Sequence, residues 1–447
     1  MDMLCTKKSF FPILDIGDNV SLFSGYAFSS KDFSEEGYPV IKIKNIQQGL
    51  VRVIENCCID KKIITEKHKK FLLSHGDILL AMTGQGSVGR VGKLILDKYE
   101  NCFLNQRVGK FIIDTDKLDK DYFYYLISTK KYEKLLFNIG SGSGQPNLSP
   151  NDIKNISIPF PKLFVQKKIA HILRTLDEKI ELNKKTNETL EEIAKAIFKS
   201  WFIDFDPVRT KAEGRSTRLP DEISDLFPDS FEDSELGKIP CGWKVISLRE
   251  MLDTISETYP IETKEEVVFL NTGDIESGNF LNTRYTSIKG LPGQAKKSIK
   301  KGDILFSEIR PRNNRHAYVY FDARDYVVST KLMVLRSKDR ENSLFEYFLI
   351  TQKSSINYLQ LLAESRSGTF PQITFSELSE IKFALPNSLQ LINFFTDNYL
   401  EISFTKIQHM NKQNKYLDEM RNTLLPKLIS GELRIPDAEK IIEEVGI

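Results

Sequence analysis

The chain has 447 residues, more than one hydrophobic core usually holds, which predicts two to four domains. With 40% hydrophobic and 28% charged residues, its composition is that of a globular protein and excludes a disordered or fibrous chain. The formal net charge is only +2, so any binding of nucleic acid must come from local clusters of charge.

Cysteine and histidine are too scattered to predict a metal site or a disulfide framework. The five cysteines show no C-x-x-C spacing, and the five histidines form no H-E-x-x-H motif. This usage favours a reducing compartment, so we expect a cytoplasmic protein. The sequence has no run of 18 apolar residues, and its start does not resemble a signal peptide, so it predicts no membrane association.

Residues 1–160 are predicted to form a first β-rich domain. Short runs of β-branched and aromatic residues at 38–44, 78–82 and 110–113 are bounded by Gly, Asp or Asn and predict strands. A helical stretch follows at 121–134.

A long helix is predicted within residues 161–205. From 164 to 198 the apolar residues recur seven apart in two registers, which is the seam of a coiled coil. The seam contains Asn183 and Asn187, a residue type that weakens packing but fixes register and partner. An amphipathic helix on a globular core is the alternative, but a helix of about 35 residues would be roughly 55 Å long, well beyond the mean.

Residues 206–240 have the composition of a linker, with four prolines among acidic residues. After it the order of elements repeats. Strand-like runs and a helical stretch predict a second β-rich domain over residues 241–386, and a second helix with a heptad seam, which includes Asn414, lies within 387–447.

An internal repeat supports this organisation. Four features recur in the same order at separations of 225 to 229 residues, a constancy that chance does not produce. The segments 45–49 and 76–79 and the prolines Pro146 and Pro161 return as 274–278, 302–305, Pro371 and Pro386. The predicted fold class is therefore α+β, with two β-rich domains joined by two long helices. If these helices form an antiparallel coiled coil, as we expect, the arrangement is pseudo-two-fold.

Motifs for catalysis are incomplete. Gly84-x-Gly86-x-x-Gly89 matches a dinucleotide fingerprint, but no helix-forming run follows it, and the repeat places arginines where the glycines stand. The pair Gly92-Lys93 lacks the rest of a P-loop, and no N-P-P-[FY] motif of an adenine methyltransferase is present. We expect no catalytic, cofactor-binding or metal-binding residue in this chain.

Polar and basic residues gather instead at the turns of both β-rich domains. Arg matches the O6/N7 edge of guanine and Asn or Gln the edge of adenine, while Lys mostly holds phosphate. A solvated surface charge is the more frequent role of any single residue, so the prediction rests on the clusters, of which 310–316 is the densest. The candidate DNA-binding residues are Lys42, Lys44, Asn45, Gln85, Arg90, Gln106, Arg107, Gln145 and Asn147 in the first domain and Arg310, Arg312, Asn313, Arg315, Lys331, Arg366 and Gln372 in the second.

With these features, the chain resembles the specificity (S) subunit of type I restriction-modification enzymes. The resemblance spans nearly the whole chain and is most specific at 38–46, 140–148, 200–208, 240–243 and 425–433. It implies two target-recognition domains that read a two-part target in double-stranded DNA without catalysis of their own. It also implies that two methyltransferase (M) subunits dock on this chain. Restriction (R) subunits would then join the complex through the M subunits. S-adenosylmethionine, ATP and magnesium would belong to those partners.

The loops of the two domains differ, so the two half-sites would differ in sequence, and the helices would act as a ruler for an unread spacer. The candidate M-docking residues are exposed charges of the two helices, although any solvated helix shows such charges. They are Glu191, Glu192, Lys195, Lys199, Lys406, Lys412, Lys415 and Glu419.

Three alternatives stay open. One is a specificity subunit of a related system whose methyltransferase and nuclease are fused. Another is a self-contained DNA-modifying enzyme, and the third is a coiled-coil scaffold whose β-rich modules bind protein or glycan.

Overall fold

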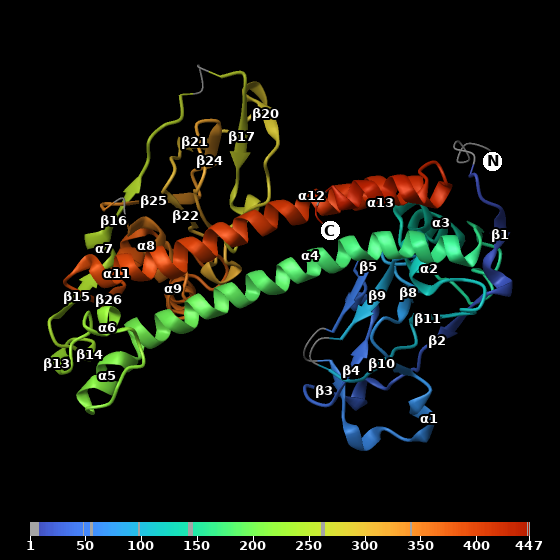
Figure 1. Cartoon of the computed structure of the whole chain (residues 1–447), viewed down its shortest axis with the longest axis horizontal. Helices are drawn as coiled ribbons and strands as arrows, with labels where there is room; N and C mark the ends of the chain where they lie inside the picture. The colour runs from blue at the N-terminus through green and yellow to red at the C-terminus, as the bar shows by residue number, and fades with distance from the viewer. Residues whose placement is uncertain are drawn as a thin grey trace. The chain divides into compact units, whose positions relative to one another are not determined.

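The computed structural model divides the chain into two compact units. Unit 1 comprises residues 1–183 and 411–447, and unit 2 comprises residues 184–410. Both boundaries fall inside long helices, α4 (Leu163–Phe198) and α12 (Ile402–Ser430), so each unit holds one β-rich domain and a part of each helix (Figure 1). The predicted α+β class is confirmed. The structure describes residues 9–47, 49–53, 57–96, 99–141, 146–260, 264–339, 342–444 and 446.

The described residues of unit 1 form two five-stranded sheets and one two-stranded sheet. The first sheet has the order β2 (Val20–Ser24), β11 (Val108–Ile113), β8 (Ile78–Ala81), β9 (Val91–Ile95) and β5 (Gly49–Arg52). The second has the order β3 (Phe33–Ser34), β6 (Cys58–Ile59), β4 (Tyr38–Ile41), β10 (Cys102–Leu104) and β7 (Leu72–Leu73). Strand β1 (Ile13–Asp15) pairs with β12 (Ser157–Pro159).

Strand β8 lies between two hydrophobic cores. Because side chains alternate across a strand, Ile78 and Leu80 enter one core while Leu79 and Ala81 enter the other. This explains why the four residues are apolar without interruption. The first of these cores also contains residues of helix α2 (Lys120–Ile127), helix α3 (Lys130–Gly140) and the first half of α4. The short helix α1 (Glu66–Lys69) lies beside the second core, where its His68 contacts the ring of Phe28.

In unit 1 the helices α4 and α12 pack in antiparallel directions. Position 177 of α4 is opposite 421 of α12, because Asp177 and Arg421 form an ion pair, and Asn183 is opposite Asn414. The amide of Asn183 donates to the carboxamide oxygen of Asn414 at 2.8 Å and to that of Gln413 at 2.8 Å. Two of the predicted seam residues therefore meet, as their place in the heptads indicates. Helix α13 (Ile435–Glu443) completes this core.

In its described residues, unit 2 repeats the order of four strands from each five-stranded sheet of unit 1. One four-stranded sheet has the order β16 (Leu252–Ile255), β25 (Leu332–Ser337), β22 (Ile304–Ser307) and β23 (His316–Tyr318). The other has the order β20 (Tyr285–Ser287), β17 (Glu266–Leu270), β24 (Tyr326–Ser329) and β21 (Ala295–Ser298). Strand β17 is parallel to β24, as β4 is to β10 in unit 1. The two-stranded sheets are β15 (Trp243–Ser247) with β26 (Lys382–Pro386), β13 (Phe231–Ser234) with β14 (Gly237–Pro240), and β18 (Ile275–Glu276) with β19 (Asn279–Phe280).

Besides parts of α4 and α12, the described residues of unit 2 form α-helices both before and after the two four-stranded sheets in the chain. They are α5 (Asp206–Ala212), α6 (Asp221–Ser224), α7 (Leu248–Met251), α8 (Ser343–Ile350), α9 (Lys353–Arg366), α10 (Phe375–Ser379) and α11 (Leu389–Phe395).

Residues 206–240, whose proline content indicates a linker, are folded onto unit 2. They form α5, α6 and the β13–β14 hairpin. Val208, Ile223 and Phe227 are buried in the same core as Trp201 and Trp243. The apolar residues between the prolines therefore give this segment a core to pack against, which its composition alone does not reveal.

The repeated Gly-Asp-Ile-Leu motif has the same structural role in both units. Asp77 accepts the backbone N–H of Ser74 at 2.9 Å and lies 2.7 Å from Lys110 of β11. Its counterpart Asp303 accepts the N–H of Lys300 at 2.8 Å and pairs with Arg336 of β25. The motif therefore closes the turn before β8 or β22 and ties it to a basic residue of the adjacent strand.

Candidate nucleic-acid interface

Three loops of unit 1 meet at one edge of the β-rich domain. The N–H of Met82 donates to the carbonyl of Arg107 at 3.1 Å, the N–H of Leu148 donates to the carbonyl of Met82 at 2.7 Å, and the N–H of Gly84 donates to the carbonyl of Pro146 at 3.4 Å. These main-chain bonds join the segments 83–90, 105–107 and 146–147, which we call loop cluster 1.

Unit 2 builds the same arrangement from different residues. The N–H of Glu308 donates to the carbonyl of Lys331 at 3.2 Å, the N–H of Ile373 to the carbonyl of Glu308 at 2.9 Å, and the N–H of Arg310 to the carbonyl of Pro371 at 3.0 Å. The residues correspond to those of loop cluster 1 with separations of 224 to 226 positions. We call the segments 309–315, 330–331 and 369–372 loop cluster 2.

Most candidates in loop cluster 1 are available at its surface. Gln85, Gln106, Arg107 and Asn147 are exposed. Arg90 is half-buried, and its guanidinium donates to the carbonyl of Gly86. Gln145 lies outside the described residues. The structure therefore brings together two of the predicted polar clusters with the exposed amide of a third.

The segment 42–45 adjoins loop cluster 1, because the N–H of Asn105 donates to the carbonyl of Ile41 at 3.2 Å. Lys44 is exposed, and the ammonium of Lys42 lies 3.5 Å from the ring centre of Phe33. Asn45 is only 2% exposed; its oxygen accepts the N–H of Lys42 at 2.9 Å and its amide donates to the carbonyl of Arg52 at 2.8 Å. Both ends of the Asn45 side chain thus serve the fold and face no ligand.

Lysines in α1 and at its C-terminal end lie on aromatic side chains, beside the turn that contains Gln106. The carbonyl of Tyr26 accepts the N–H of Gln106 at 2.9 Å, and the ammonium of Lys67 lies 5.8 Å from the centre of the Tyr26 ring. The ammonium of Lys70 lies 5.1 Å from that of Phe71. A cation on an aromatic ring keeps its charge at the surface while its stem is packed. Tyr26 is missed by sequence reasoning, since no motif links it to the turn.

Loop cluster 2 is richer in arginine. Arg310, Arg312 and Asn313 are exposed, and the half-buried Arg315 donates to the carbonyl of Ile275 at 3.2 Å. Its turn, η9 (Pro311–Asn313), is flanked on both sides by residues in the left-handed region, Arg310 (φ 46°) and Asn314 (φ 52°).

The remaining candidates of unit 2 have partners. The ammonium of Lys331 lies 3.4 Å from the carboxylate of Glu308, and Arg366 pairs with Glu377. Gln372 is half-buried and bridges to Ile309 through the main chain. These residues lie in or beside loop cluster 2, but Arg366 is bound to helix α10 rather than to the loops.

A histidine buried beneath loop cluster 2 carries no charge at neutral pH. The Nδ1 of His316 lies 3.0 Å from the hydroxyl of Tyr347. Burial, with a smaller contribution from the nearby charge of Lys195, lowers the pKa of His316 to about 4. The positive charge of this surface therefore comes from arginine and lysine.

The triple-glycine loop lacks the geometry of a dinucleotide site. Gly84, Gly86 and Gly89 all have positive φ values, but the loop leads into strand β9 and not into a helix. A pyrophosphate site of that type needs the N-terminus of a helix at this point. In loop cluster 2 the position of Gly84 is occupied by Arg310.

Two other kinds of site are absent from the described parts of the chain. Within 9–444, apart from the gaps given above, no three His, Cys, Asp or Glu side chains are grouped to hold a metal ion. Nor does any helix in these parts have the length and apolar character that a membrane crossing requires.

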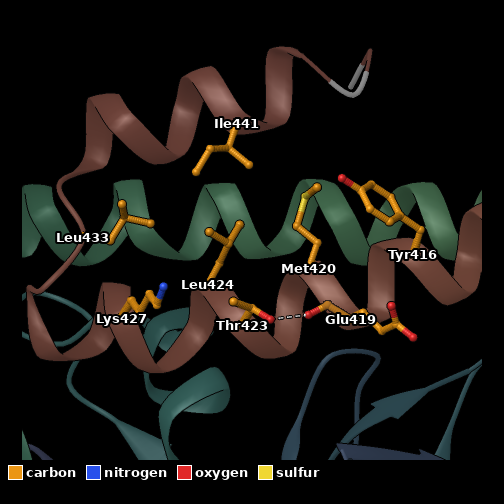
Figure 2. A pocket seen from close by; sticks show the side chains of 8 residues that line it. All are labelled: Tyr416, Glu419, Met420, Thr423, Leu424, Lys427, Leu433 and Ile441. Atoms are coloured by element: carbon orange, nitrogen blue, oxygen red, sulfur yellow. Dashed lines mark hydrogen bonds between the residues drawn. The ribbon is translucent and has the colours of Figure 1, made fainter.

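A pocket of about 320 Å³ lies between α12 and α13 in unit 1 (Figure 2). Ile441 projects from α13 toward α12, and the hydroxyl of Thr423 donates to the carbonyl of Glu419 at 2.8 Å. None of the candidate DNA-binding residues lines it. Its lining residues are Tyr416, Glu419, Met420, Thr423, Leu424, Lys427, Leu433 and Ile441.

Comparisons with known proteins agree with the repeated architecture. The family model described as type I restriction modification DNA specificity domain matches residues 9–192 and 240–412, that is, both β-rich domains, most of α4 and the first part of α12. In an overlay that covers 96% of this chain and 98% of the other, with a TM-score of 0.55, the fold is similar to a crystal structure of the S subunit of a type I restriction-modification system from M. genitalium. The sequence identity is 18%, so this likeness concerns the fold alone.

Among curated relatives, the specificity subunit of the type I restriction enzyme MjaIX from Methanocaldococcus jannaschii is 28% identical over 340 residues, 73% of this chain and 72% of the relative. The specificity subunit of HindI from Haemophilus influenzae is 45% identical over 148 residues, which is 32% of each chain. Because the family model covers well over half of the sequence, the chain belongs to the family of type I restriction-modification DNA specificity subunits, which recognise DNA and are not catalytic.

Proposed function

We propose that this chain reads a two-part, asymmetric DNA target, one half through loop cluster 1 and the other through loop cluster 2. One observation carries the proposal. The same three main-chain hydrogen bonds hold both clusters, while the exposed side chains on them differ. A shared frame with different side chains is what two readers of different sequences need, because base edges are distinguished by side-chain donors and acceptors.

The chemistry of modification would come from other polypeptides. We propose that two methyltransferase subunits dock on the charged sides of α4 and α12. Restriction subunits would join the complex through the methyltransferase subunits. S-adenosylmethionine, ATP and magnesium would be bound there. The charged residues named for docking in the sequence analysis are all exposed, which supports this assignment.

Mapping of methylated adenines tests the proposal. The chain is expressed with its methyltransferase partners in a host that lacks other adenine methylation, and modified positions are located across the genome. We expect one two-part motif with a fixed gap and two unlike halves. The control is the partner subunits without this chain, which should leave no motif.

The purified chain alone, incubated with DNA and S-adenosylmethionine, should yield no methylated product. Methylation by the chain alone would contradict the proposal and favour a self-contained enzyme. A continuous or a palindromic motif would contradict the assignment of one half-site to each loop cluster.

A further inference from the structure

The three arginines of the loop 309–315 have unequal freedom. The guanidinium of Arg315 donates to the carbonyls of Ile275 at 3.2 Å and Gly273 at 3.4 Å and lies 3.7 Å from the carboxylate of Glu276. Its donors are therefore engaged by the segment that leads into and forms β18. Arg315 fastens the end of the loop to this neighbouring segment.

Arg310 fastens the start of the loop. Its N–H donates to the carbonyl of Pro371 at 3.0 Å, and its guanidinium donates to the carbonyl of Thr369 at 3.3 Å. Its φ of 46° is rare for a residue with a side chain, whereas the corresponding Gly84 adopts positive φ without steric cost. The strained conformation is maintained by these contacts with the segment 369–371.

Arg312 and Asn313 are left at the tip of the loop. Both are exposed, and within the described residues their side chains form no hydrogen bond or ion pair. The main chain of Arg312 is nevertheless fixed, because its N–H donates to the carboxamide oxygen of Gln360 at 3.0 Å. Gln360 is 4% exposed, and its amide donates to Glu364 at 2.8 Å.

We infer that Arg312 reads a guanine in the half-site bound by unit 2, and that Gln360 is its positioning residue. This inference rests on the proposed function. The guanidinium matches the O6 and N7 acceptors of guanine with two parallel hydrogen bonds. A fixed main chain lowers the entropy lost when the side chain docks, so a free arginine on a held backbone is suited to this contact.

The arrangement is specific to unit 2. In loop cluster 1 the loop approaches helix α3 through Gly89, where a Cβ would lie 2.8 Å from the carbonyl oxygen of Glu133. In loop cluster 1 the loop is therefore held by the close packing of Gly89 on α3, and not by a side-chain hydrogen bond such as that of Gln360. The guanine contact should therefore belong to one half-site only.

The test compares methylation motifs of the complete complex with its partner subunits. Arg312→Ala should relax the choice of base at one position of one half-site, by about 5- to 150-fold, and leave the other half-site unchanged. Arg312→Lys keeps the charge but not the two-pronged geometry, so it should relax the same position while retaining most of the affinity. Arg324→Ala removes an exposed arginine, paired with Asp322 after β23, and should leave the motif unchanged.

The positioning role is tested by a double variant. Gln360→Met keeps the size of the side chain but removes the acceptor, so it should weaken discrimination at the position that Arg312 reads. In the Arg312→Ala background Gln360→Met should add no further loss at that position, whereas general damage to the fold would add one at every position.

Two results would overturn the inference. One is an unchanged motif in Arg312→Ala. The other is an equal loss of binding to all sequences together with a shallower salt dependence, which indicates a phosphate contact. A wild-type complex without any two-part motif would contradict the proposed function before a variant is compared.

Discussion

A glutamate in unit 2 is buried with little to stabilise its charge. Glu346 of α8 is 2% exposed, and within the described residues its Oε2 has no hydrogen-bond partner. Burial, with a smaller contribution from the nearby carboxylate of Asp339, raises the pKa of Glu346 to about 8. The folded chain therefore retains a proton that the unfolded chain releases above its ordinary value of 4.5.

The stability of unit 2 should consequently fall as the pH rises from about 4.5 to about 8. With about 1.4 kcal/mol for each pKa unit, the loss at alkaline pH is on the order of 3 to 5 kcal/mol. Glu346→Gln, which mimics the protonated acid, should melt at a higher temperature than the wild type at pH 8.5 and at a similar temperature at pH 5. Thermal unfolding at several pH values measures this difference.

The control for this effect is Glu192→Gln, which changes an exposed glutamate of α4. Its melting temperature should follow that of the wild type at every pH. Parallel profiles of Glu346→Gln and the wild type would show that Glu346 does not carry the pH dependence.

At the level of single residues, the sequence indicates where the candidate site lies better than it indicates which residues belong to it. Residue type and turn position identify Gln106, Arg107 and Arg312, which the structure places at the surface. The same reasoning includes Asn45, whose amide is consumed by two main-chain partners. It omits Gln360, because a glutamine inside a helix carries no local signal of a contact 48 residues away.

At the level of elements, the polar contact of Asn183 with Asn414 and Gln413 between α4 and α12 should contribute to stability. Asn183→Leu leaves the oxygens of Asn414 and Gln413 without their donor, which should cost about 1 to 3 kcal/mol of stability. Asn183→Leu with Asn414→Leu should recover part of this loss, since the two leucines pack against each other. Denaturant unfolding of Asn183→Leu, Asn414→Leu and the double variant gives the coupling energy.

We expect a coupling of at least about 0.5 kcal/mol between the two asparagines. Lys184→Ala, at an exposed neighbour, should change stability by less than about 0.5 kcal/mol. Additive losses of the two asparagine variants would show that the two residues do not act as a pair.

Among the elements, those with a strong period could be predicted and those without one could not. The heptads indicate α4 and α12, and alternating or β-branched runs indicate β8, β11 and β17. The strand-like run at 327–335 forms two strands rather than one, because Thr330 and Lys331 form a turn between β24 and β25. The fold of 206–240 depends on a distant aromatic core, which no local pattern reports.

For the whole molecule, the ruler hypothesis links the length of the helices to the unread gap of the target. Helix α4 has 36 residues, about 54 Å at 1.5 Å for each residue. Four residues inserted at matching levels of α4 and α12 would add about 6 Å to each, so the preferred gap should lengthen by roughly two base pairs. Mapping of methylated adenines reads the gap directly.

Four residues inserted in the exposed turn at 213–216 serve as the control and should leave the gap as it is. An unchanged gap in the helix variant, with both half-sites still recognised, would rule out the ruler.

The repeat allowed the two-domain organisation to be predicted from the sequence alone, because four matched features fix the offset between the halves. The limits of the compact units could not be predicted in this way. They fall at 183/184 and 410/411, inside continuous helices where neither composition nor periodicity changes.

The hydrogen bonds that frame both loop clusters use main-chain groups only, and every residue type except proline supplies both of these groups. The exposed side chains of Gln85, Arg107, Arg312 and Asn313 are therefore not needed to maintain this frame, whereas those of Arg310 and Arg315 hold the loop 309–315 to its neighbours. New DNA targets can then be recognised after exchange of a few surface residues, with little loss in the free energy of unfolding. A library randomised at Gln85, Arg107, Arg312 and Asn313 should yield a high proportion of folded proteins. Selection from this library would then act on DNA recognition and not on the stability of the fold.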